Sequence, residues 1–434
     1  LLLAVVGWSV FSIFQNTQAN LARRGIASGF SFLSNEAGFG ISEVLPVPRL
    51  DPAFLLILAL LAGGILATLL LKRVLRARGL TIGGDYRLIL TALFLVVGLP
   101  TLALYWVGGA LVADLYDETG SYGLALVTGV FNTVKVSALA CLAATAIGFA
   151  VGIARLSDNW LVARLAGAYV EVVRNIPLLL QIFFWYFAVL STLPGVAESL
   201  HPLPGVIINN RGVYLPEPEP LAGFHPFLLA FLASVVGVYF WLRHVRLTRE
   251  RSGAHLPVFF PGLAILVAGP GFAWLVAGAP VRLSFPVLEG FNFVGGLNFS
   301  PEFAAMLLGL SIYTGAFIAE IVRGGIQAVS RGQKEAAAAL GLKPDQVMWL
   351  VVIPQALRVI VPPLTSQYLN ATKNSSLGVA IAYPELVSIG GTTLNQSGQA
   401  IEVIAITMAV YLTFSLLISV FMNWFNARVA LEVR

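Results

Sequence analysis

Polar side chains that could hold a charged ligand gather in one stretch of the sequence, from Pro362 to Ser376. Its candidate ligand-binding residues are Gln367, Asn370, Lys373, Asn374 and Ser375. The three amides recur at i, i+3 and i+7, so on a helix they share one face. An amide has both donor and acceptor atoms and can therefore satisfy either the ammonium or the carboxylate of a zwitterion. The same groups could instead join transmembrane helices by hydrogen bonds, and both interpretations stay open.

Gln181 is a second candidate for the same site, because it follows a predicted break in a helix. Pro177 lacks the N–H that the interior of a helix requires, so the helix should break there. A broken helix within a membrane can turn its free backbone groups toward a cavity. We therefore expect Gln181 to line a cavity together with the polar stretch.

Charged residues within or beside apolar runs predict ion pairs. Glu171 with Arg174, and Glu320 with Arg323, are spaced i, i+3, so each pair can form within one helix. Contact with another domain is the alternative for these residues. Lys135 lies in the outward half of its apolar run, and its ammonium is expected to reach the outer interface.

Several kinds of chemistry lack their residues in this sequence. No lysine follows a glycine, as G-x-x-x-x-G-K-[ST] requires, so ATP hydrolysis by that route is excluded. The four histidines show no metal-binding spacing. The single cysteine, Cys141, lies in an apolar run and is expected to be a small buried side chain. No catalytic Ser, His and Asp set or carboxylate pair falls in a predicted pocket. The sequence predicts neither an enzyme nor a bound cofactor or metal.

The composition predicts an all-α polytopic membrane protein. Of the 434 residues, 58% are hydrophobic and only 11% are charged. Apolar runs long enough to span a bilayer predict about ten transmembrane helices. They cover residues 1–14, 54–71, 88–113, 123–154, 176–194, 224–242, 257–278, 302–322, 351–372 and 400–426. The chain begins at Leu1, inside an apolar run and without Met, so its true start is expected to be missing and no signal peptide is assigned.

The basic residues predict the orientation of these helices. The formal net charge is +5, but most of the Lys and Arg residues fall in alternate short loops, as the positive-inside rule requires. Nucleic acid is therefore not expected as a partner. The rule places the loops around 72–87, 155–174, 243–251 and 323–343 on the cytoplasmic side.

The last of these loops should form two short helices. Ser330 and Gln333 have the spacing of a capping box before an Ala-rich run, which predicts a helix over 331–340. Gly341 suits the left-handed residue that ends a helix, and Pro344 suits the first turn of the next. A helix of this length is roughly 15 Å long and cannot cross a bilayer. It should lie on the cytoplasmic surface.

This loop resembles the E-A-A loop of bacterial ABC importer permeases, which reads E-A-A, three residues, G, nine residues, I-x-L-P. The matching parts are Glu335-Ala336-Ala337, Gly341 and Val351 to Pro354. The flanking I-V-R-G-G-I-Q-A-V-S-R-G-Q and P-Q-A-L-R are similar to the polar amino acid permeases of the histidine, glutamine and glutamate type. The resemblance implies that the loop docks into a cleft of a partner ATPase, which binds the ATP and Mg²⁺. The expected docking residues are Glu335, Ala336, Ala337, Leu340 and Gly341.

The resemblance also implies the rest of a complex in the bacterial inner membrane. Its expected members are a second, related permease subunit, two copies of a cytoplasmic ATPase and a periplasmic amino acid-binding protein. The substrate would be an L-amino acid, and membrane lipid would surround the helices. Family members usually read K-D-T-S where this chain has Lys373 to Ser376, so an acidic side chain is missing and broad specificity is expected. An ion-coupled secondary transporter, or a permease for another small polar solute, is the alternative.

The resemblance covers only part of the chain and predicts its division. Residues 1–113 should hold three extra helices, 114–194 the first part of the permease core, and 301–434 the second part with the coupling loop 324–350. Residues 195–300 would be an insertion with two further helices, as in the larger permease subunits of general L-amino acid importers. Within it, the Pro-rich segment from His201 to Pro220 predicts an extended, exposed loop.

Overall fold

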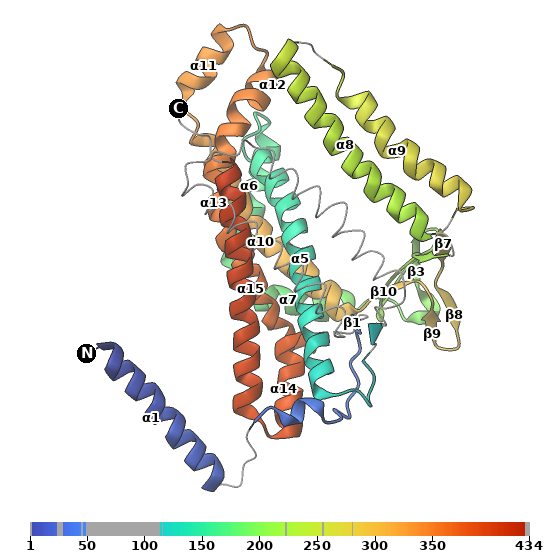
Figure 1. The fold of residues 1–434 in the computed structure, drawn as a ribbon, viewed down its shortest axis with the longest axis vertical. Helices are drawn as coiled ribbons and strands as arrows, with labels where there is room; N and C mark the ends of the chain where they lie inside the picture. Colours follow the sequence, from blue (N-terminus) through green and yellow to red (C-terminus); the bar gives the residue numbers. More distant parts are fainter. Residues whose placement is uncertain are drawn as a thin grey trace. The chain divides into compact units, whose positions relative to one another are not determined.

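The computed structural model describes residues 2–23, 29–44, 47–48, 113–114, 116–221, 224–253, 256–279 and 281–429 (Figure 1). The helices predicted over 54–71 and 88–113 lie outside the described residues, apart from position 113. The chain divides into two compact units. The first consists of Leu1–Val47, Leu115–Tyr214 and Asn298–Arg434, and the second of Pro48–Asp114 and Leu215–Leu297.

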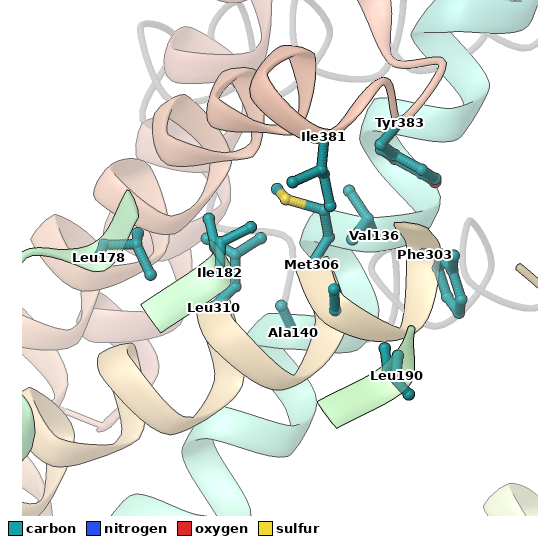
Figure 2. Close-up of a cluster of buried hydrophobic side chains, with 11 residues drawn as sticks. Val136, Ala140, Leu178, Ile182, Leu190, Phe303, Met306, Leu310, Ile381 and Tyr383 are labelled. Atoms are coloured by element: carbon teal, nitrogen blue, oxygen red, sulfur yellow. The ribbon is translucent and has the colours of Figure 1, made fainter. Parts of the chain in front are cut away.

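Two long helices form the centre of the first unit: α5 (Tyr122–Ala154) and α10 (Pro301–Gln327). They approach closely because Gly148 and Gly152 of α5 face α10, where a Cβ on Gly152 would lie 2.7 Å from the carbonyl oxygen of Ala319. Small residues spaced four apart allow membrane helices to pack backbone to backbone. The side chains of both helices then interdigitate in a buried apolar cluster (Figure 2).

The remaining helices of the first unit surround this pair. Beside it lie α13 (Ile353–Asn374) and α15 (Ala400–Val429), and α13 continues into the short 3₁₀ helix η6 (Ser375–Ile381). The helix α14 (Leu386–Ser397) packs on α5 and α15. Before α5, the described chain contains α1 (Leu2–Arg23), η1 (Ser31–Ser34), β1 (Val47–Pro48) and, in the second unit, β2 (Ala113–Asp114).

The predicted break at Pro177 is present. The helix α6 (Trp160–Asn175) ends two residues before the proline, and α7 (Leu178–Phe183) begins directly after it. The chain continues as a π-helix, η3 (Phe184–Leu190). The axis bends by 106° at the break, so the two arms form either one broken span or a re-entrant loop. Pro177 causes the bend because it supplies no N–H for a continuous ladder.

The Pro-rich segment is extended, as predicted, but it is not an exposed loop throughout. After the 3₁₀ turn η4 (Val196–Glu198) it forms strands, whose side chains are all exposed over 200–203 and alternate over 206–215, where Ile207, Asn209 and Tyr214 are buried. The strands of one sheet lie in the order β10 (Leu297–Phe299), β5 (Gly212–Leu215), β4 (Val206–Asn209) and β3 (Leu200–Leu203). Gly205, at φ 78°, makes the tight turn between β3 and β4.

The second unit contains a helical pair and two short hairpins. The pair consists of α8 (Phe224–Ser252) and α9 (Phe259–Val276), which pack on each other. The strands pair as β6 (Glu217–Pro220) with β7 (Val281–Ser284), and β8 (Val287–Glu289) with β9 (Asn292–Val294). The prediction of two helices inside the insertion agrees with this unit.

Six helices of the described chain are long and apolar enough to cross a membrane, and the bent pair would make a seventh. They include α5, α8, α9, α10, α13 with its flanking turns, and α15. The run predicted over 1–14 does form a helix, but α1 is not among the six described spans. Its second half carries Gln15, Asn16, Gln18 and Asn20. The chain is mostly helical and multi-pass, as the sequence predicted, with small β-sheets that the sequence did not predict.

Candidate functional site

The loop between α10 and α13 has the predicted form of two short helices. The first, α11 (Arg331–Ala339), is followed by Gly341 at φ 78°, and α12 (Pro344–Val347) then begins with its proline in the first turn. The N–H of Gly341 donates to the carbonyl of Ala338 at 2.9 Å, and that of Leu342 to Ala337 at 3.3 Å. These two bonds are the Schellman motif, which uses a left-handed glycine to end a helix.

The side chains of α11 differ in exposure. Leu340 is 82% exposed and Glu335 and Ala336 also face outward, whereas Ala337 is only 4% exposed. The packing partner of α11 is the π-turn η5 (Met348–Val352), which leads into α13. Ala337 therefore packs against its own chain and is not on the outward face, contrary to the expectation from the sequence.

The predicted capping box at the start of α11 does not form. Ser330 is the N-cap, but its side chain accepts no hydrogen bond from the helix. The Gln333 side chain instead accepts a hydrogen bond from Gln355 of α13 at 3.3 Å. Gln333 thus links α11 to α13 and does not cap the start of α11. The loop is held to the following helix by this bond and by the burial of Ala337.

The amide residues of α13 share one helical face, as predicted. Asn370 and Lys373 are exposed, and Gln367 and Asn374 are half-buried. Within the part of the chain that the structure describes, none of these four side chains makes a hydrogen bond or an ion pair. Polar groups on a membrane helix are costly next to lipid, so this face must meet water or another protein. Ser375 differs, because it is buried and donates to the carbonyl of Thr372 at 2.7 Å.

Gln181 has a structural task that the sequence did not reveal. Its side-chain amide nitrogen donates to the carbonyls of Val173 and Ile176, both at 2.9 Å. These carbonyls lose their helical partners where Pro177 ends α6. Gln181 is buried and stabilises the break from the next helix, and among the described residues it makes no hydrogen bond to α13. Its position on the substrate path stays a prediction.

No group of three or more His, Cys, Asp or Glu side chains in the described ranges could hold a metal ion. Cys141 is half-buried in α5. The described residues therefore combine an exposed short helix, α11, with a polar face on α13.

Known proteins are similar in sequence to this chain along nearly its whole length. The model of the family "binding-protein-dependent transport system inner membrane component" matches residues 254–433. The YhdX protein of Escherichia coli K12, named as an amino-acid ABC transporter permease, is 42% identical over 432 residues, which cover 99% of this chain and 91% of the relative. The chain belongs to this family. The general L-amino acid transport system permease AapQ of Rhizobium johnstonii is 48% identical over 328 residues, covering 76% of this chain and 82% of the relative.

A solved amino acid ABC transporter, crystallised with histidines, matches 71% of this permease and 95% of its own chain, with 20% identity and a TM-score of 0.43. The family consists of inner-membrane transport subunits and not of enzymes. The permease described here is therefore a multi-pass component of an ABC transporter.

Lys135 of the permease does not reach the outer interface, and that expectation was wrong. Its Nζ lies 2.5 Å from Oε1 of Glu43, which belongs to the segment between η1 and β1, and its side chain is only 19% exposed. The ammonium also lies 4.4 Å from the centre of the Phe303 ring, a cation–π distance. Burial raises the pKa of Glu43, and the hydrogen bond and charge of Lys135 oppose that rise. The pair ties the N-terminal segment to α5 and α10.

Glu385 is a buried acid that the sequence did not single out. It is fully buried and caps α14 by accepting the N–H groups of Val387 at 2.9 Å and Ser388 at 2.8 Å. Tyr411 of α15 donates to the same carboxylate at 3.1 Å. Burial raises the pKa of Glu385, and these hydrogen bonds partly offset the rise. The only sequence signal was an acid directly after Pro384, which is typical of many loops.

The two E-x-x-R sequences behave differently. Glu320 and Arg323 form the predicted ion pair, and Arg155 at the end of α5 joins them. Glu171 and Arg174 form no ion pair in the described chain, which contradicts the prediction. Arg174 instead lies 4.9 Å over the ring of Phe317. The two sequences have the same spacing, but their surroundings differ. The Phe317 ring lies beside Arg174, whereas Arg155 adds a second positive charge to the Glu320–Arg323 pair.

Proposed function

We propose that the chain is the transmembrane subunit of an ATP-driven importer for L-amino acids with broad specificity. The proposal rests chiefly on the short exposed helix α11. Its end is fixed by the left-handed residue Gly341, and α12 and η5 then lead into α13, the helix with the polar face. An exposed helix that is too short to span a membrane, inside a transport subunit, is suited to receive movement from another protein. The similarity to YhdX and AapQ, which are described as permeases of amino acid transport systems, supports amino acids as the substrate class.

The coupling surface consists of the outward residues of α11 and the turn after it. Glu335, Ala336 and Leu340 face away from the chain and are available to a groove on an ATPase. Ala337 contributes from the inner side by seating α11 against η5. Gly341 sets the direction in which the chain leaves the helix. ATP and Mg²⁺ are bound by the partner ATPase and not by this chain.

The substrate path runs along the amide face of α13. Gln367, Asn370 and Asn374 can donate to a carboxylate or accept from an ammonium. The neighbouring Lys373 adds a positive charge, and no acidic residue shares this face. A path lined by amides selects poorly between acidic, neutral and basic amino acids, which supports broad specificity. Gln181 and Ser375 shape this path by fixing the α6 break and the end of α13.

The complete transporter contains further subunits. Two ATPase subunits need two coupling helices, and the sequence has one E-A-A loop, so a second permease chain completes the complex. We propose a related but different subunit, because the inserted helices and sheets make this chain larger than the core requires. A periplasmic amino acid-binding protein delivers the substrate. Isolation of an active complex with this chain as its only permease would establish a homodimer instead.

The proposal is tested by purification from native membranes, followed by uptake of labelled Glu, Leu and Lys into proteoliposomes. Leu340→Ser should release the ATPase and abolish ATP-driven uptake, because Leu340, the C-cap of α11, is an apolar side chain that is 82% exposed. Leu165→Ser is the matched control, since Leu165 on α6 is 64% exposed but lies outside the loop. Uptake that persists without any ATPase and follows an ion gradient would identify a secondary transporter and refute the proposal.

A further inference from the structure

A chain of charged and polar side chains connects the end of α5 to the last turn of α10. Arg155, the residue that caps α5, donates from Nη1 to one carboxylate oxygen of Glu320. Arg323 donates from Nε to the other oxygen at 3.2 Å and also from Nη2. Its Nη1 then donates to the Gln327 side chain at 2.8 Å. Gln327 is the last residue of α10, so this network reaches the start of the coupling loop.

The two helices that this network joins are already packed as one body. Gly152 lies against Ala319 and Val322, the residues directly before Glu320 and Arg323 along α10. Only three residues, 328–330, separate α10 from α11, and Val329 among them is buried. A displacement of α11 is therefore passed to α10 over a short, partly anchored connection. The network adds a polar link between α5 and α10 next to this glycine contact.

Glu320 is the single acid between two arginines. Its side chain is 30% exposed and that of Arg155 only 15%, so water screens the pair weakly. Without the carboxylate, two guanidinium groups would face each other across the helix contact and repel. The other E-x-x-R sequence provides a comparison within the same chain, because Glu171 forms no ion pair among the described residues. The role of Glu320 therefore follows from its contacts and not from its sequence motif.

We propose that Glu320 is a positioning residue for energy coupling, which makes α5 and α10 move together when the ATPase displaces α11. This inference rests on the proposed function of α11. It assigns Glu320 no contact with substrate or nucleotide. It predicts that loss of the carboxylate lowers the amount of solute carried per ATP hydrolysed and leaves ATPase binding intact.

The test compares Glu320→Gln with Glu171→Gln in the purified, reconstituted complex. Mutations in coupling networks change coupling by about 0.5–2 kcal/mol, so uptake per ATP should fall about tenfold in Glu320→Gln. The same ratio should change less than about twofold in Glu171→Gln, as expected for a substitution at an exposed residue without an ion pair. An unchanged ratio in both variants would overturn the inference, as would an equal loss in both.

A second pair of variants decides the matter if Glu320→Gln does not fold. Arg155→Met removes the link between the helices and keeps the Glu320–Arg323 pair, and it should also lower uptake per ATP. Arg155→Lys keeps the charge and should restore most of the ratio, which a purely structural role of the arginine fork would not predict. If Arg155→Met has normal uptake per ATP, Glu320 does not couple the helices. If the unmodified complex shows no ATP-driven uptake, the proposed function itself fails.

Discussion

Gly341 should be the most sensitive position of the coupling loop. Its φ of 78° lies in the left-handed region, which costs other L-residues about 1–2 kcal/mol and is most unfavourable for β-branched side chains. A Cβ at this position would meet no atom within 4 Å, so the cost comes from the backbone and not from a collision. Gly341→Val should relieve this strain by abandoning the left-handed turn, which breaks the Schellman bonds and changes the direction from α11 to α12.

The effect on activity should be far larger than the effect on stability. A cost of about 2 kcal/mol is a fraction of the free energy of unfolding of a domain, so the protein should still fold and insert. The same cost reduces the population of the correct turn by more than tenfold. ATP-driven uptake should fall by about that factor in proteoliposomes, and the ATPase should still hydrolyse ATP.

Two matched variants isolate the backbone as the cause. Gly341→Asn should retain most of the uptake, because Asn is the other residue that commonly adopts the left-handed C-cap. Gly332→Val places the same side chain at an exposed glycine of α11 that has open space and no positive φ, so it should change uptake little. Normal uptake by Gly341→Val, or equal losses in Gly341→Val and Gly332→Val, would refute the reasoning.

Four further predictions test other parts of the structure. Lys135→Met leaves Glu43 buried without its partner and should reduce the free energy of unfolding, measured by denaturation in detergent, by about 3 kcal/mol. The double variant Lys135→Met with Glu43→Gln should recover most of this loss. Gly152→Ala should destabilise the α5–α10 contact by about 1–3 kcal/mol in the same assay, whereas Gly167→Ala in open space should not. Burial raises the pKa of Glu385, so the folded state binds its proton more tightly than the unfolded state. The melting temperature should therefore fall as the pH rises from the ordinary Glu pKa through the raised pKa. Glu385→Gln should remove this dependence on pH. Asn374→Asp should favour uptake of Lys and Arg over Glu and Asp, because a fixed negative charge attracts cations.

The sequence predicted the features that depend on local chemistry. The short helix α11 follows from its Ala-rich run, its end from Gly341, whose backbone reaches the left-handed region, and the break from Pro177, which has no N–H. The hydrophobic runs likewise predicted the spans that the structure describes, since any membrane helix needs a similar apolar length. The amide face of α13 needed only the helical period. In each case a few consecutive residues contain the whole cause.

The features that the sequence did not predict depend on partners far along the chain. Lys135 was expected at an interface because it lies in the outward half of its apolar run, yet it pairs with Glu43, which lies 92 positions away. Arg174 lost its predicted pair to Phe317 on another helix, and Arg155 joined Glu320 from a distance of 165 positions. In the Pro-rich segment β3, β4 and β5 pair locally, and the sequence did not predict this, whereas β5 with β10 and β6 with β7 pair across the α8–α9 insertion. Local spacing names the possible partners of a charge, and tertiary packing selects among them.

Buried charges occur in the first unit where elements distant in sequence must be held together. Glu43 with Lys135 ties the N-terminal segment to α5, and Glu385 with Tyr411 joins the start of α14 to α15. Glu320 with Arg155 joins α5 to α10. Apolar contacts alone would let these helices slide, because lipid competes equally for apolar surface in a membrane. A buried ion pair is worth little as net stability but is costly to break, so it fixes one register between two helices. A transport subunit that must move in defined steps needs such fixed registers between the elements that move together.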